Sequence, residues 1–193
     1  MQKKSHIGPL GHKAVLLAGC ALFIMVSLLS ARSYAASAKK IDFKVDVTLL
    51  RFSRFVSGAK EYAKVAKGML VIPNVIKAAF IIGGEYGEGC LRVDGKTVDY
   101  YNIAAASFGL QIGAQAKDII LVFMTEEALN RFRAGSGWEA GVDGNIALIT
   151  IGDGVRIDTT TMKDPIVGFV LDVKGLMADV SLKGSKFTKL DKK

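Results

Sequence analysis

The feature that most constrains this fold is a change in the spacing of apolar residues at Gly68. Before it, from about residue 39 to residue 67, apolar side chains recur every three or four positions, which predicts a helix. After it, apolar residues alternate with polar or small ones over 107–115, 167–173 and 176–183. This spacing is typical of strands that bury one face.

Shorter sequence patterns predict the remaining strands, a turn and a helix. Residues 119–124 and 146–151 are nearly continuous apolar runs, which favours strands covered on both faces. Asp94-Gly95 predicts a tight hairpin turn. Thr125, followed by two glutamates, predicts a capped short helix that ends near Arg133. We therefore expect an α+β fold, in which a long N-terminal helix packs on a largely antiparallel, strongly coiled sheet or barrel-like sandwich, with one further short helix.

The first 35 residues have the three parts of a secretory signal peptide. Lysines precede an uncharged apolar run over residues 14–30, and Ser33-Tyr34-Ala35 offers small residues to a signal peptidase. We expect cleavage after Ala35, with Ala38 of Ala36-Ser37-Ala38 as the alternative site. Cleavage after Ala35 makes residues 1–35 the signal and residues 36–193 a single domain with a short basic C-terminal tail. The protein would then be exported, to the periplasm or the cell envelope.

Two alternatives for this segment remain open. The apolar run could stay uncleaved as an anchor, although its 17 residues are at the lower limit of the roughly 17–25 that span a bilayer. Leu17-Ala18-Gly19-Cys20 also has the form of a bacterial lipobox, in which Cys20 would be acylated.

Removal of 35 of the 193 residues leaves 158, which is enough to bury a hydrophobic core that is stable without disulfides or bound metals. The remaining 22 Lys and Arg against 18 Asp and Glu give a net charge of +4. This is a mild preference for anionic partners and not the charge of a nucleic-acid binder, so we expect no nucleic-acid partner. Cys90 is the only cysteine left, which excludes a disulfide framework.

The residue types also limit the chemistry. Both histidines, His6 and His12, lie in the signal peptide. The domain therefore lacks the groups for Ser-His-Asp or Cys-His catalysis and for His-ligated metals. Gly-Lys-Thr at 95–97 resembles a phosphate-binding loop, but the glycine spacing is wrong and the segment falls in a hairpin. We expect no catalytic residues, no metal, no cofactor and no enzyme activity.

A dense glycine cluster lies over residues 83–89. Glycine within a strand marks a bend, a bulge or the close approach of a backbone or ligand. A coiled sheet turning a corner is one interpretation. The other is a ligand-contacting surface, which would include Gly83, Gly84, Glu85, Tyr86, Gly87, Gln111 and Gln115.

Several blocks of this sequence match a known family in order and spacing. They are Ala66-Lys67-Gly68-Met69-Leu70-Val71-Ile72-Pro73-Asn74-Val75, the glycine cluster, Ser107-Phe108-Gly109-Leu110-Gln111-Ile112-Gly113-Ala114-Gln115, Phe123-Met124-Thr125, and Lys174-Gly175-Leu176 with Val180-Ser181-Leu182 and Gly184-Ser185. Together they resemble the SYLF domain family over about residues 42–190. The chain departs from the family pattern at Met177, Asp179 and Lys183, and has alanines at 104–106 where glycines are usual.

The resemblance implies a lipid-binding domain without enzyme activity. Eukaryotic members bind phosphoinositide membranes through their N-terminal region, and some fungal members bind actin filaments. Bacterial members resemble exported or envelope-associated proteins. An exported protein would meet neither phosphoinositides nor actin, so those ligands do not carry over.

A basic helix face gives the lipid hypothesis its candidate residues. Lys60, Lys64 and Lys67 share one face of the predicted helix, and Arg51 and Arg54 add to it. We expect these five side chains to meet an anionic phospholipid membrane. The alternatives are a helix with solvated lysines, an envelope structural or protein-interaction module with an envelope protein as partner, and a carrier of an apolar small molecule.

Overall fold

Two very long strands organise the fold. The structure is a computed structural model that describes residues 36–151, 163–172 and 181–192. Within these residues the helices are α2 (Ala38–Phe55), α3 (Ala59–Val65) and α4 (Glu126–Ala134). The strands are β1 (Gly68–Val93), β2 (Lys96–Phe123), β3 (Gly137–Glu139), β4 (Ala147–Ile151), β5 (Ile166–Asp172) and β6 (Lys186–Leu190). The expected α+β class is confirmed.

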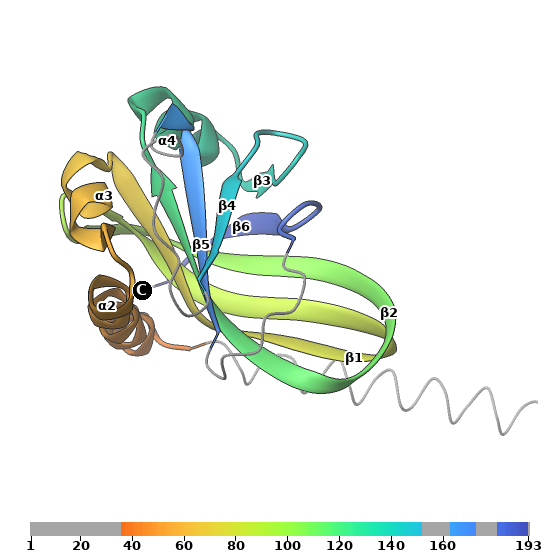
Figure 1. Ribbon diagram of the computed structural model, residues 1–193. Helices are drawn as coiled ribbons and strands as arrows, with labels where there is room; N and C mark the ends of the chain where they lie inside the picture. The colour runs from red at the N-terminus through yellow and green to blue at the C-terminus, as the bar shows by residue number, and fades with distance from the viewer. Residues whose placement is uncertain (1–35, 152–162, 173–180, 193) are drawn as a thin grey trace, which may run out of the picture. The chain divides into compact units, whose positions relative to one another are not determined.

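Strands β1 and β2 form one antiparallel hairpin that supplies both halves of a curled sheet (Figure 1). Near the hairpin turn, β2 pairs on its other side with β6, and β6 pairs with β3. At the far end of the hairpin, β2 pairs with β5, and β5 pairs with β4 in parallel. All the other pairings are antiparallel, so the expected largely antiparallel, coiled sheet is also confirmed.

The hairpin bends so far that the two ends of β1 face each other. A Cβ placed on Gly89 would lie 1.9 Å from the carbonyl oxygen of Val71, and one on Gly87 would lie 2.8 Å from Cγ2 of Val75. Only glycine permits backbones to approach this closely. These two glycines of the 83–89 cluster therefore have a structural role, because they bring the two halves of the sheet into contact.

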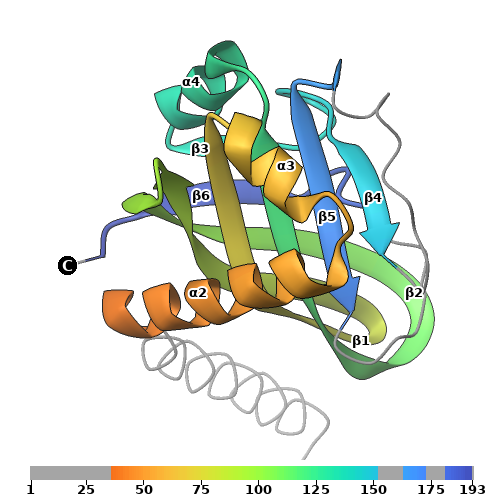
Figure 2. The same cartoon turned by 60° about the vertical axis from the view of Figure 1, so that its left-hand side comes forward.

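The part of the sheet formed by β5 and the end of β2 that pairs with it is covered on both faces. Its inner side chains, such as Leu121 and Val170, belong to the core between the two halves. Its outer face lies under α2 and α3, where the ring of Phe169 packs edge-on against Phe52 and Tyr62 at centroid distances of 4.9 and 5.1 Å (Figure 2). The expectation of one buried face for 167–173 was therefore wrong, because helices add a third layer over β5. The covered run expected at 119–124 is confirmed for Ile119–Phe123, which are all fully buried, whereas Met124 lies beyond β2 and is partly buried.

The expected single helix over 39–67 is broken. Helix α2 ends at Phe55, and α3 begins after Gly58, whose φ of +86° is left-handed. Phe55, the last residue of α2, is 64% exposed. The break also means that residues before and after position 57 do not share one continuous helix face.

Both local turn predictions are confirmed. Asp94 and Gly95, with φ values of 50° and 75°, form a two-residue hairpin turn between β1 and β2. The hydroxyl of Thr125 accepts a hydrogen bond from the backbone N–H of Ala128 and caps α4. Leu129 and Phe132 of α4 then pack into the core.

Two predictions concern the C-terminal part of the chain. Most of the strand expected over 176–183 lies outside the described residues, and Ser181 and Leu182 precede β6 without joining a strand. The basic C-terminal stretch supplies β6 itself, in which Lys189 pairs with Asp99 at 2.6 Å. Lys192 follows and pairs with Glu88 at 3.0 Å.

Candidate functional site: the outer face of helix α2

Helix α2 has apolar side chains on two opposite faces. Ile41, Val45, Thr48 and Phe52 face the sheet and are buried. On the opposite side, Phe43, Val47 and Leu50 follow the same i, i+4, i+7 spacing but are 69%, 41% and 70% exposed. A helix that only needed to cover the sheet would carry polar residues there.

Basic residues continue this exposed row at both ends. Lys39 precedes Phe43 by four positions, and Arg54 follows Leu50 by four. We call these five side chains the α2 row: Lys39, Phe43, Val47, Leu50 and Arg54. Lys40 lies beside the row, and Lys39, Lys40 and Arg54 are all exposed.

The two acidic residues of α2, Asp42 and Asp46, bind side chains of the sheet. Thr97 and Tyr100 donate hydrogen bonds to the carboxylate of Asp42 at 2.7 and 2.9 Å. Arg92 donates to Asp46 at 2.8 Å and lies 3.7 Å from Asp42. These contacts leave the α2 row with apolar and positive groups.

The hydrogen bonds also shift the acidity of the groups beneath α2. Partial burial alone would raise the pKa of Asp42, but the bonds from Thr97 and Tyr100 and the charge of Arg92 outweigh it and hold this pKa below its usual 3.8. Burial and the neighbouring Asp42 raise the pKa of Tyr100 to about 12. Asp42 is therefore a carboxylate, and Tyr100 a neutral hydroxyl, at neutral pH.

The structure separates the five basic residues expected to form one face. Arg51 donates a hydrogen bond of 2.7 Å to Asp118, which is 3% exposed, so Arg51 anchors α2 to the sheet. Arg54 lies in the α2 row, whereas Lys60 and Lys64 are exposed on α3. Lys67 is exposed beyond α3, and its backbone N–H binds the carbonyl of Phe123.

The glycine-rich segment lies within β1, opposite Ser107 to Tyr101 of β2. Gly83 and Gly84 are in this stretch, and Gly87 contacts the other end of β1 as described above. Glu85 is buried in ion pairs with Lys117 at 2.8 Å and Lys77 at 3.8 Å.

Tyr86 is the exposed aromatic residue of the segment and donates a 2.8 Å hydrogen bond to Glu88. Burial of its hydroxyl and the bond to Glu88 raise the pKa of Tyr86 to about 12. Gln111 and Gln115 lie in β2, with Gln115 opposite Lys77 in the register, and their side chains are outside the described part of the structure. Cys20 is also outside the described residues.

Two properties of the described part of the chain bear on function. No helix over residues 36–151, 163–172 and 181–192 is long and apolar enough to cross a membrane. Over the same ranges, no group of three or more His, Cys, Asp or Glu side chains is placed to hold a metal ion.

The exposed residues of the α2 row were missed from the sequence, apart from Arg54. The signal was present as a second i, i+4, i+7 apolar spacing on the same helix. Which of two apolar faces packs on the sheet depends on contacts that are distant in the sequence, such as that between Phe52 and Phe169.

Comparisons with known proteins identify similar sequences. A family model described as Ysc84, Las17-binding protein actin regulator, matches residues 104–193. Proteins named SH3 domain-containing YSC84-like protein 1 from Rattus norvegicus, Xenopus laevis and Homo sapiens are each 27% identical to this chain over 125 residues. These alignments cover 62% of this chain and 36–37% of each relative, so the chain spans little more than a third of their length.

Proposed function

Because this chain belongs to the SYLF (Ysc84) family of lipid- and protein-binding domains, we propose that it is an exported, non-enzymatic module that binds anionic phospholipid surfaces through the α2 row. The export part of the proposal depends on the signal-like residues 1–35. The binding part depends on the geometry of α2.

The observation that carries the proposal is the pairing of exposed apolar side chains with positive ends on one helix face. Phe43, Val47 and Leu50 would enter the boundary between headgroups and acyl chains, as the apolar face of an interfacial helix does. Burial of such side chains contributes about 25 cal/mol per Å² of apolar surface removed from water. Each basic residue at the edge adds about 1 kcal/mol at an anionic surface.

The charges favour a membrane over a second copy of this chain. Two copies packed through their α2 rows would bring Lys39, Lys40 and Arg54 of each copy together, and like charges in contact oppose association. An anionic surface neutralises the same charges. The acidic residues Asp42 and Asp46 lie outside the α2 row, and their pairing with Arg92 partly offsets their charge.

Vesicle co-sedimentation tests the proposal with the protein recovered after export, whose N-terminus is fixed by intact mass. We expect it to pellet with phosphatidylglycerol or cardiolipin vesicles at low salt, to bind phosphatidylcholine weakly, and to be released as salt rises. The double change Phe43→Ser and Leu50→Ser should weaken binding at least about tenfold, because it removes most of the apolar contact.

Val142→Ser is the matched control, since Val142 is 74% exposed and lies outside α2. It should bind like the unchanged protein. Any apolar residues left at the N-terminus are common to all three proteins and cannot explain a difference between them. Failure to pellet with either anionic lipid at low salt would overturn the proposal, and a stable partner found by cross-linking would then favour a protein-interaction module.

A further inference from the structure

A cavity of about 430 Å³ lies near β3 and β4, the two end strands of the sheet order. It is lined by residues just after β3, by the start of β4, and by the segment that leads into β6: Ala140, Gly141, Asn145, Ile146, Leu148, Ser181, Leu182 and Lys183. In the described residues, β3 and β4 are the last strands of the sheet order and do not pair with each other. The cavity therefore lies between the segments that lead to the two ends of this strand order.

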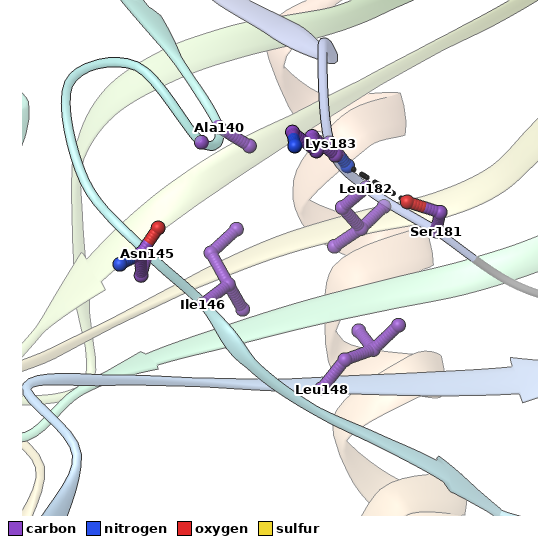
Figure 3. Close-up of a pocket in the computed structure, with 8 residues that line it drawn as sticks. Ala140, Asn145, Ile146, Leu148, Ser181, Leu182 and Lys183 are labelled. Atoms are coloured by element: carbon purple, nitrogen blue, oxygen red, sulfur yellow. Dashed lines mark hydrogen bonds between the residues drawn. The ribbon is translucent and has the colours of Figure 1, made fainter.

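The floor of the cavity is continuous with the hydrophobic core. Leu182 is 3% exposed and belongs to the core cluster, and Ile146 and Leu148 pack against that cluster. Figure 3 shows these three side chains pointing into a common space from two segments of the chain. An apolar group bound here would be removed from water and would contact apolar side chains of the core.

The rim is polar and carries one kind of charge. Asn145, Ser181 and Lys183 are all exposed, and Lys183 is the only ionisable residue among the eight that line the cavity. The backbone N–H of Lys183 binds the hydroxyl of Ser181 at 3.2 Å, which holds the two rim residues together (Figure 3).

Gly141 helps to place the lysine. A Cβ at this position would lie 2.9 Å from Cγ of Lys183, so the absence of a side chain lets the lysine stem pack on the backbone of Gly141. The stem is thereby held at the rim, from which its ammonium group can meet an anionic partner.

We propose that this cavity binds a single-chain amphiphile with an anionic head group, of the fatty acid class. The acyl chain would contact Ile146, Leu148 and Leu182, and the carboxylate would meet Lys183, with Asn145 and Ser181 as hydrogen-bond donors. The volume is in the range of about 300–1,000 Å³ that is common for small-molecule sites. The inference does not depend on the membrane-binding role of α2, because it uses none of the same residues.

Titration with dodecanoate below its micelle concentration, followed by methyl NMR of isoleucine and leucine, tests this inference. We expect the resonances of Ile146, Leu148 and Leu182 to shift, and acetate, which has the carboxylate but no chain, to leave them in place. Dodecanol and dodecyltrimethylammonium should bind more weakly than dodecanoate, because neither can pair with Lys183.

Charge reversal supplies the matched variants. Lys183→Glu should weaken dodecanoate binding about tenfold, whereas Lys186→Glu should leave it within about twofold, because Lys186 is exposed on β6 outside the cavity lining. Both positions are exposed, so neither change threatens folding. Ser181→Phe, also at an exposed position, should block the cavity.

Two results would overturn the inference. One is equal binding by the unchanged protein, Lys183→Glu and Ser181→Phe. The other is a dodecanoate response confined to residues of the α2 row, which would assign the ligand to the membrane face. If dodecanoate does not shift the resonances of the cavity residues but the protein still binds vesicles, the cavity proposal fails and the proposed function is unaffected. The failure of one proposal can therefore be distinguished from the failure of the other.

Discussion

At Gly89 the two ends of β1 come within a distance that no side chain tolerates. Gly89→Ala would place a methyl group 1.9 Å from a backbone oxygen, and this clash can be relieved only by moving one half of the sheet. We expect a loss of about 2–4 kcal/mol in the free energy of unfolding, measured by urea denaturation.

Gly84→Ala is the matched control on the same strand. Its Cβ would have a nearest neighbour at 3.6 Å, an ordinary contact. The change should be neutral or slightly stabilising, because alanine restricts the unfolded chain more than glycine does. Equal stability of the two variants would contradict the close approach of the two halves.

Asp42 should make stability depend on pH in the acidic range. Its pKa is lower in the folded state than in the unfolded chain, so the unfolded chain binds more protons as the pH falls through this range. The stabilisation is therefore complete above the unfolded pKa of about 3.9 and is lost as the pH falls through the lower, folded value.

Urea denaturation of the unchanged protein and Asp42→Asn between neutral pH and pH ~2 measures this effect. We expect the difference in unfolding free energy to be largest above pH ~4 and to shrink below it. Tyr100→Phe, which removes one of the hydrogen bonds to Asp42, should give an intermediate dependence. A difference that is constant with pH would show that Asp42 does not titrate in this way.

At the scale of elements, the ion pair between Arg51 and the buried Asp118 helps to join α2 to the sheet. Asp118 accepts hydrogen bonds from Arg51 and from the backbone N–H of Asn74, which lies in the bulge between Ile72 and Val75. Asp118→Ala leaves both donors without this partner, so we expect a loss of about 2–4 kcal/mol in unfolding free energy.

Two arginine variants separate this role from general charge loss. Arg51→Gln should destabilise the protein, because it leaves a buried carboxylate without its ion pair. Arg54→Gln removes the same charge from the exposed row and should change stability by less than about 0.5 kcal/mol. Similar effects of the two changes, measured by thermal or urea unfolding, would contradict the assignment of Arg51 as an anchor.

Elements with strong local signals could be predicted from the sequence, and those that depend on distant contacts could not. Asp94-Gly95 and the cap at Thr125 need only a few neighbouring residues, and both were found. The break at Gly58 also had a local signal, but the apolar spacing continues through it and favours one long helix. Arg51 was grouped with the lysines because nothing near it in the sequence indicates Asp118.

For the molecule as a whole, Trp138 reports on the core. It is the only tryptophan, is 3% exposed, and lies against Phe132 and Phe187 at centroid distances of 5.5 and 5.9 Å. We expect blue-shifted emission in the folded protein and a red shift in urea, with the same midpoint as the loss of far-ultraviolet circular dichroism. Two separate midpoints would show that the halves of the sheet unfold independently.

The fold class could be predicted because helix and strand spacing occupy separate parts of the chain. The arrangement of the two halves could not, since it arises from a bend within single strands of 26 and 28 residues. Alternation patterns in such strands look like several short strands in succession. The glycine cluster did indicate a bend or close approach, and Gly87 and Gly89 are the residues at which that contact occurs.

The shared hairpin also sets the order in which this protein can fold. The turn at Asp94-Gly95 closes the shortest loop in the sheet, and each strand pair formed beside it brings the next pair together at little entropic cost. Pairing of β2 with β6 needs a much longer loop, so we expect it to follow. A slow step in folding should then be the bending of the already paired β1–β2 hairpin, which brings the two ends of β1 together, rather than the pairing of separate strands.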